Sequence, residues 1–120
     1  MILVDSSIWI DHLRYEIAEV SHLATSKQIL IHPFVIGEIA VGNLKNRSEV
    51  LRGLHDMPAA MVVSDADALD FIERFLLAGR GLSYIDIHLL AAARLNEATL
   101  WTADRRLQKS AELLSLSITP

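Results

Sequence analysis

The sequence contains no cysteine. This absence excludes disulfides, zinc–thiolate sites and thiol catalysis, and it fits a reducing compartment. The longest stretch without a charged residue, residues 28–37, has ten residues, whereas a helix that spans a bilayer needs roughly 20. The first five residues include no basic side chain, so we expect no signal peptide, no membrane partner and a cytoplasmic protein.

Positive charge is also scarce. Eleven Lys and Arg face 15 Asp and Glu, which gives a formal net charge of −4 and a pI near 5.6. Proteins that hold nucleic acid only through its phosphate backbone are usually basic, so this balance disfavours a passive DNA or RNA binder. The argument reverses locally wherever carboxylates hold a cation.

Hydrophobic residues are abundant by comparison, at 52%. Counted with Gly and without Tyr they are 65 of 120 residues, above the usual share of about 45–50%. This content excludes disorder and leaves apolar surface for a partner, and we expect a homodimer. The chain has no repeat or linker, and its length suits one domain, so we predict a single domain over residues 1–120.

Short apolar runs alternate with longer amphipathic segments. We predict strands at 2–4, 29–31, 61–63 and 99–101, with a candidate short strand at 116–118. We predict helices after each of the first four strands, and additional helices at 16–26, 48–57 and from Ser83 onward. This alternation predicts an α/β domain with a parallel sheet covered by helices on both faces. Ligand sites in such folds lie at the carboxyl ends of the strands.

Four acidic residues are expected at that edge. Asp5 directly follows the first strand, and Asp104 follows the strand at 99–101 after a two-residue link. Asp86 lies in the first turn of the helix after Gly81, and Glu38 lies in the second turn of the helix after 29–31. Each aspartate taken alone is well explained as a helix cap or as compensation of a helix dipole. Glu38 is the only acid in residues 28–44, so it would need a partner.

Together these acids indicate a cation site. Four carboxylates at one place repel one another unless a cation lies among them. Oxygen ligands without Cys or paired His select a hard ion such as Mg²⁺ or Mn²⁺. Such ions activate water and stabilise charge on phosphate. The residues therefore predict an α/β domain with a candidate divalent-metal site and phosphate chemistry.

Four blocks of sequence resemble a known family. They are VDSSIWID at 4–11, HPFVIGEIAVG at 32–42, GLSYIDIHLLAAA at 81–93 and LWTADRRL at 100–107. In this order and spacing they look like PIN-domain ribonucleases and, more narrowly, like VapC-type toxins of type II toxin–antitoxin pairs. The resemblance covers nearly the whole chain. It implies a PIN-like three-layer α/β/α fold, Mg²⁺- or Mn²⁺-dependent endonucleolytic cleavage of RNA (tRNA or rRNA), a homodimer and a VapB-type antitoxin.

The resemblance also implies roles for individual residues. The family's four acids fall on Asp5, Glu38, Asp86 and Asp104, as metal ligands, with Glu38 either ligating or orienting the attacking water. A hydroxyl after the first acid (Ser6 or Ser7) and another at Thr102 would orient the carboxylates or a metal-bound water. The implied products carry 5′-phosphate and 3′-hydroxyl ends. Candidates for contact with RNA phosphates are Arg80, Arg105 and Arg106, and Lys45 and Arg47 are weaker candidates. The alternative for each is an ordinary solvated charge.

Two alternatives remain open at this point. A phosphatase with Asp5 as nucleophile would resemble the haloacid dehalogenases, but that family has an Asp at the position of Ser7. A catalytically inactive PIN or receiver-like interaction module is the second alternative. An inactive PIN domain would be expected to have lost acids, and this sequence keeps all four.

Overall fold

A three-stranded parallel sheet forms the centre of the computed structural model, which describes residues 1–118. Its strands β1 (Ile2–Val4), β2 (Ile29–Leu30) and β3 (Thr99–Trp101) lie in the order β2-β1-β3. Ile2 pairs with residue 29 on one side and with residue 99 on the other. The first strand is therefore central, and its carboxyl end lies between those of its two neighbours.

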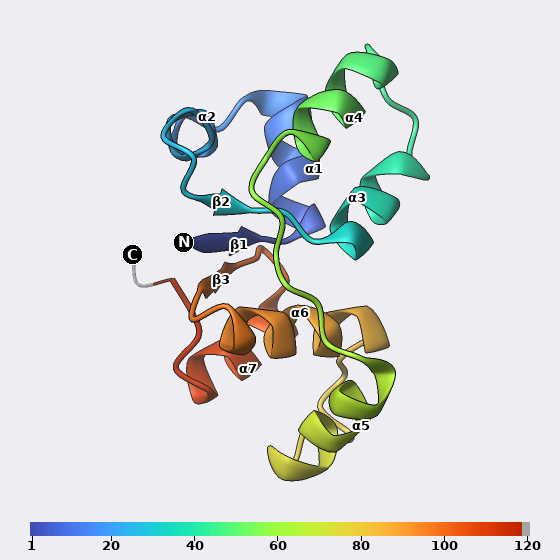
Figure 1. Ribbon diagram of the computed structural model, residues 1–120, viewed down its shortest axis with the longest axis vertical. Coiled ribbons are helices and arrows are strands. Elements are labelled where there is room, and N and C mark those ends of the chain that lie inside the picture. Colours follow the sequence, from blue (N-terminus) through green and yellow to red (C-terminus); the bar gives the residue numbers. More distant parts are fainter. Residues whose placement is uncertain (119–120) are drawn as a thin grey trace.

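Helices lie on both sides of this sheet. In Figure 1, α1 to α4 gather on one side, α6 and α7 lie on the other, and α5 extends beyond α6 at the far end of the molecule. The arrangement confirms the predicted α/β fold with helices on both faces. None of the helices within residues 1–118 is long and apolar enough to cross a membrane. The helices are α1 (Ser6–Tyr15), α2 (Ala18–Thr25), α3 (Pro33–Ala40), α4 (Arg47–His55), α5 (Asp65–Arg74), α6 (Tyr84–Leu95) and α7 (Arg105–Leu113).

Local capping explains where several helices begin. The Ser64 hydroxyl accepts a hydrogen bond from the Asp67 amide at the start of α5. Ser83 and Asp86 form a reciprocal capping box at the start of α6, as the spacing predicts. Pro33 occupies the first turn of α3, where a missing N–H costs nothing.

The core lies where α6 packs against the sheet. Leu3, Val4 and Leu100 from the strands are completely buried, as are Leu89 and Leu90 from the helix. Seven consecutive residues of α6, 87–93, are buried, which is typical of a helix enclosed on all sides. Each fully buried Leu contributes about 1.5–3 kcal/mol relative to an exposed one. This packing fixes α6, and with it Asp86, relative to the strands.

The prediction of a strand at 61–63 is wrong. Met61 and Val62 are more than half exposed, and neither lies in a strand. The backbone N–H and C=O of Met61 instead bond the side-chain amide of Asn96, at 3.0 and 2.9 Å. Parallel pairing on this side of the sheet is a single bridge between Ile31 and Ala59. A three-residue apolar run gives no signal for a side-chain partner 35 residues away.

The candidate strand at 116–118 is reduced to a single bridge. Ser117 pairs with Leu100 beside β3. The backbone N–H of Leu100 donates to the Leu116 carbonyl at 2.7 Å, and Ile118 N–H donates to the Leu100 carbonyl at 3.3 Å. The segment therefore extends the sheet beyond β3 without forming a regular strand.

Candidate functional site at the carboxyl edge of the sheet

Asp5 lies at the carboxyl end of β1, and several hydrogen bonds fix its carboxylate. Its backbone N–H donates to the Trp101 carbonyl at 2.9 Å, which ties the end of β1 to the end of β3. Its side chain is 6% exposed. Oδ1 accepts from the Ser6 N–H at 2.8 Å, while Oδ2 accepts from the hydroxyls of Ser7 and Thr102 at 2.8 and 2.7 Å. These bonds fix the orientation of the carboxylate.

Ser6 connects Asp5 with Glu38. Its hydroxyl oxygen lies 3.0 Å from Glu38 Oε1 and 3.4 Å from Asp5 Oδ1. A hydroxyl has one proton to donate, and the shorter distance assigns that proton mainly to Glu38. The sequence left Ser6 and Ser7 as alternatives, but the structure uses both, Ser6 toward Glu38 and Ser7 toward Asp5.

Ser7 and Thr102 join Asp5 to the start of α7. Their hydroxyl oxygens lie 3.3 Å apart. The Ala103 N–H donates to Ser7 Oγ at 3.0 Å, and the Asp104 N–H donates to Thr102 Oγ1 at 3.1 Å. The two hydroxyls thus position the link between β3 and α7, and with it Asp104, relative to Asp5.

Asp86 and Asp104 act as helix caps, as the simpler interpretation of these acids expected. Asp86 Oδ2 accepts from the Ser83 N–H at 3.0 Å. Asp104 Oδ1 accepts from the N–H groups of Arg106 and Leu107 at 2.9 and 3.1 Å. Within residues 1–118, Oδ1 of Asp86 and Oδ2 of Asp104 accept no hydrogen bond. Each cap therefore leaves one carboxylate oxygen available.

The four carboxylates influence one another electrostatically. Burial raises the pKa of Glu38, and repulsion from Asp5 and Asp86 raises it further, although the Ser6 hydrogen bond opposes the shift. Burial also raises the pKa of Asp86, and Asp5 and Asp104 add to it. No Lys or Arg side chain in residues 1–118 forms an ion pair with a carboxylate. Within the described residues, the acids at this edge are therefore not paired with a cationic side chain.

The donor chemistry at this edge fits a hard divalent ion. All of its side chains are carboxylates or hydroxyls, which are ligands of Mg²⁺ and Mn²⁺, and a cation would relieve their repulsion. With the side chains as they stand, however, residues 1–118 contain no group of three or more His, Asp or Glu arranged to hold a metal ion. Asp86 and Asp104 point to their own helix N-termini.

The phosphatase alternative lacks its second aspartate, because the position two residues after Asp5 is Ser7. The Ser7 hydroxyl donates to Asp5 Oδ2 at 2.8 Å, so this side chain orients Asp5.

An aromatic cluster that the sequence did not reveal connects the helices that carry Glu38 and Asp86. His88 is buried with its ring centre 4.9 Å from that of Phe34 and 4.7 Å from that of Tyr84. Its Nε2 lies 3.2 Å from Asp65 Oδ1, which also accepts a 2.6 Å hydrogen bond from the Tyr84 hydroxyl. The cluster joins α3, α5 and α6, two of which carry Glu38 and Asp86. Because Asp65 is 23 residues from His88 in the sequence, no local pattern signals the pair.

His32 caps α3 from a fully buried position. Its Nδ1 accepts from the Phe34 N–H at 3.0 Å, while the buried Nε2 has no hydrogen-bond partner within residues 1–118. Burial lowers the pKa of His32 to about 4, and the neighbouring His88 contributes. His32 is therefore a neutral structural residue.

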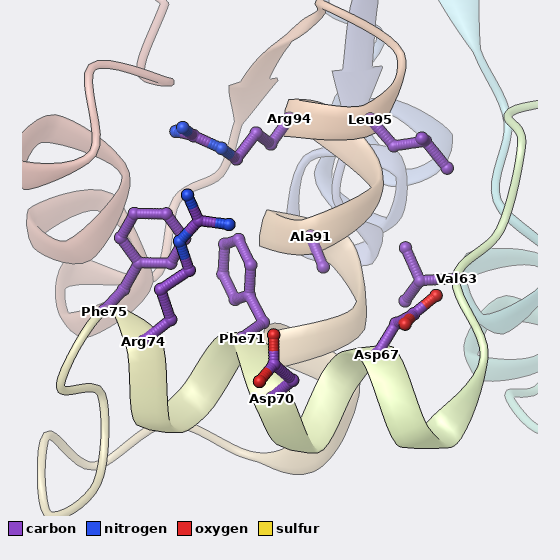
Figure 2. Close-up of a pocket in the computed structure, with 9 residues that line it drawn as sticks. All are labelled: Val63, Asp67, Asp70, Phe71, Arg74, Phe75, Ala91, Arg94 and Leu95. Atoms are coloured by element: carbon purple, nitrogen blue, oxygen red, sulfur yellow. The ribbon is translucent and has the colours of Figure 1, made fainter.

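An open hollow of about 330 Å³ lies between α5 and α6, and the four carboxylates of the candidate site do not line it. In Figure 2 its Arg74 and Arg94 lie near Phe75, with their guanidinium carbons 5.5 and 4.7 Å from the ring centre. None of Asp5, Glu38, Asp86 and Asp104 lines it. The hollow is therefore separate from the candidate site.

Comparison with known proteins places these features in context. Residues 2–113 match the PIN domain family. Two proteins named Ribonuclease VapC32, from the CDC 1551 / Oshkosh and H37Rv strains of Mycobacterium tuberculosis, are 41% identical over 109 residues, which covers 90% of this chain and 88% of theirs. The crystal structure of PAE2754 from Pyrobaculum aerophilum superposes with a TM-score of 0.63 at 19% identity, covering 94% of this chain and 85% of that one.

Proposed function

The chain belongs to the PIN-domain family as a ribonuclease of the VapC type, and we propose that it cleaves RNA endonucleolytically with a divalent ion, as the toxin of a type II toxin–antitoxin pair. The observation that carries the proposal is the set of hydroxyl contacts that connects the acids at one sheet edge: Ser6 lies between Asp5 and Glu38, and Thr102 joins Asp5 to the Asp104 N–H. The extent of the family match supports a single PIN domain over residues 1–120.

Asp5, Asp86 and Asp104 are the proposed ligands of Mg²⁺ or Mn²⁺, and Glu38 either joins them or orients the attacking water. When bound, such an ion would activate water and stabilise negative charge on the phosphate. Asp5 suits a fixed ligand because Ser7 and Thr102 hold its carboxylate in one orientation. Asp86 and Asp104 each keep a free oxygen after capping.

Glu38 suits the role of orienting the attacking water because it is partly buried and is linked to Asp5 through the Ser6 hydroxyl. Burial raises its pKa, which makes it a better proton acceptor than a solvated glutamate. The Ser6 hydroxyl holds one of its oxygens and leaves the other for a water molecule. In the proposed reaction, the water oxygen bonds to phosphorus and gives a proton to Glu38. The bond between phosphorus and the 3′ oxygen breaks, the 3′ oxygen takes up a proton from solvent, and the products carry 5′-phosphate and 3′-hydroxyl ends.

The experiment that tests this function is a cleavage assay on total tRNA and rRNA in Mg²⁺, Mn²⁺ and EDTA, with the 5′ ends of the products mapped. We expect discrete, metal-dependent cuts that Asp5→Asn loses while it keeps its fold. Asp70→Asn is the matched control, because it removes one acid from the exposed side of α5. Cleavage by Asp5→Asn at the wild-type rate would overturn the site.

The proposed partners are a VapB-type antitoxin and a second copy of the chain. The VapC relatives support the antitoxin, and the exposed large hydrophobics support apolar contact surfaces, among them Val41 and Leu76. Light scattering at low micromolar concentration tests the homodimer, and a 13 kDa particle would contradict it. Co-purification with the product of a neighbouring antitoxin gene, and loss of cleavage in that complex, tests the other partner.

A further inference from the structure

The side chain of Arg106 lies across Gly81. A Cβ atom placed on Gly81 would meet Arg106 Cδ at 2.7 Å, Nη1 at 2.9 Å and Nε at 3.1 Å. Real Cβ atoms do not tolerate such distances, so any other residue at position 81 would displace the guanidinium. Gly81 also has a φ of +74°, which disfavours L side chains. The glycine therefore provides the space in which the arginine lies.

This contact connects the helix starts that carry two of the four carboxylates. The backbone N–H of Arg106 bonds Asp104 Oδ1. Gly81 comes two residues before Ser83, whose N–H bonds Asp86 Oδ2. The arginine side chain thus runs from the start of α7 to the turn that leads into α6. These are the helix ends that carry Asp104 and Asp86.

Within residues 1–118 the exposed Arg106 guanidinium makes no hydrogen bond and no ion pair. Other arginines are engaged. Arg80 Nε donates to the Leu76 carbonyl, and the Arg47 guanidinium donates to the carbonyls of Ala40 and Gly42. Arg105 is exposed like Arg106 but has no comparable glycine contact. The structure therefore separates Arg106 from the other phosphate-binding candidates.

An exposed guanidinium with unused donors is suited to an anion from outside the protein. Its planar donor fork matches two oxygens of one phosphate. We propose that Arg106, positioned by Gly81, binds a backbone phosphate of the RNA beside the bond that is cut. The inference rests on the proposed ribonuclease function and deepens it. Arg106 is assigned to substrate binding, and the carboxylates to the reaction.

The test measures binding of bulk tRNA by fluorescence anisotropy in EDTA, where no cleavage is expected, between 50 and 200 mM salt, a range over which phosphate contacts are strongly screened. We expect Arg106→Gln to weaken binding about tenfold and to reduce the slope of log K against log salt by about 1. Arg106→Lys should recover the salt slope but only part of the affinity, because it keeps the charge and loses the fork. Arg105→Gln serves as the neighbouring-charge control.

Substitutions at Gly81 and Gly79 provide a second, matched pair of variants. Gly81→Ala should reproduce the binding defect and add nothing when Arg106 is already Gln. Gly79 has a similar φ of +76°, but a Cβ atom placed on it would meet nothing within 4 Å. Gly79→Ala should therefore impose similar strain and bind tRNA as the wild type does. Melting temperatures of both variants verify that each is folded.

The outcomes distinguish this inference from the proposed function. Folded Arg106→Gln that binds tRNA with wild-type affinity and salt slope overturns the arginine's role, even if the wild type cleaves RNA in Mg²⁺. An equal binding loss in Gly79→Ala and Gly81→Ala overturns the glycine's role. If no metal supports cleavage but Arg106→Gln still changes the salt slope, the catalytic proposal fails and the phosphate contact stands.

Discussion

Thr102 Oγ1 lies 2.7 Å from Asp5 Oδ2, although the two residues are 97 positions apart in the sequence. The contact connects the ends of two adjacent parallel strands. The same hydroxyl accepts the Asp104 N–H at 3.1 Å. One side chain therefore sets the orientation of the first acid and the position of the last.

Removing this hydroxyl should loosen the site. We expect Thr102→Val, which keeps the shape, to lower the free energy of unfolding by about 1–2 kcal/mol because buried Asp5 loses a donor. Cleavage should fall roughly 10–100-fold, as is usual for groups that orient metal ligands. Urea unfolding and cleavage kinetics measure both effects.

Two variants serve as controls for this prediction. Thr102→Ser keeps the hydroxyl and should retain most of the activity. Thr99→Val changes the threonine that begins β3, just before Thr102 in the chain, and its hydroxyl forms no hydrogen bond in the described part of the chain. A Thr99→Val defect as large as that of Thr102→Val would attribute the loss to the strand and not to the contact with Asp5.

The Ser6 hydroxyl should control the protonation of Glu38. Because its hydrogen bond stabilises the ionised carboxylate, Ser6→Ala should raise the pKa of Glu38 further. Titration of the glutamate side chains by carbon NMR in EDTA measures this. Ser7→Ala is the control, since it removes a bond to Asp5 and leaves Glu38 untouched. An unchanged Glu38 titration in Ser6→Ala would contradict the assignment of the bond.

Burial of Glu38, together with repulsion from Asp5 and Asp86, should make the metal-free protein less stable at neutral pH. The folded-state pKa of Glu38 is raised, so the stability it contributes is present below its ordinary pKa and is lost as pH rises through the folded value. We therefore expect Glu38→Gln to raise the melting temperature by a few degrees at pH 7.5 in EDTA and by less at pH 4. Exposed Glu49→Gln should show no such difference.

The melting temperature should also rise when a divalent metal ion is added. A divalent ion that binds only the folded state stabilises it, by about 2.7 kcal/mol at one hundred times its dissociation constant. Mg²⁺ or Mn²⁺ should thus raise the melting temperature of the wild type more than that of Glu38→Gln. A lack of any response to either ion in the wild type would argue against the metal site independently of activity.

His32 should make the protein acid-sensitive. Its pKa is about 4 in the folded state, against 6.5 ordinarily, so the unfolded chain binds a proton first as pH falls. Stability is therefore lost between pH 6.5 and 4, in total by roughly 3 kcal/mol. His32→Asn keeps a cap acceptor for α3 and should flatten this dependence in urea unfolding. Exposed His22→Asn should keep the wild-type slope, and a steep slope in His32→Asn would exclude His32 as the cause.

Local sequence patterns predicted much of the secondary structure. The runs at 2–4 and 99–101 form strands at the centre of the sheet, and the caps at Ser64 and Ser83 begin helices through bonds that span only three residues. The run at 61–63 is also apolar but forms no strand, and the Asn96 side chain satisfies the backbone of Met61. Composition alone does not distinguish these two situations.

The sequence by itself determined which residues follow the strands, and hence that Asp5 and Asp104 share one edge of a parallel sheet, because the order of short strands and helices is a local property. Only the tertiary structure decided which atoms meet there. The contacts of Ser6 with Glu38, Thr102 with Asp5 and Arg106 with Gly81 join segments 25 to 97 residues apart. Such contacts depend on strand register and helix packing, which many weak interactions across the whole core fix together.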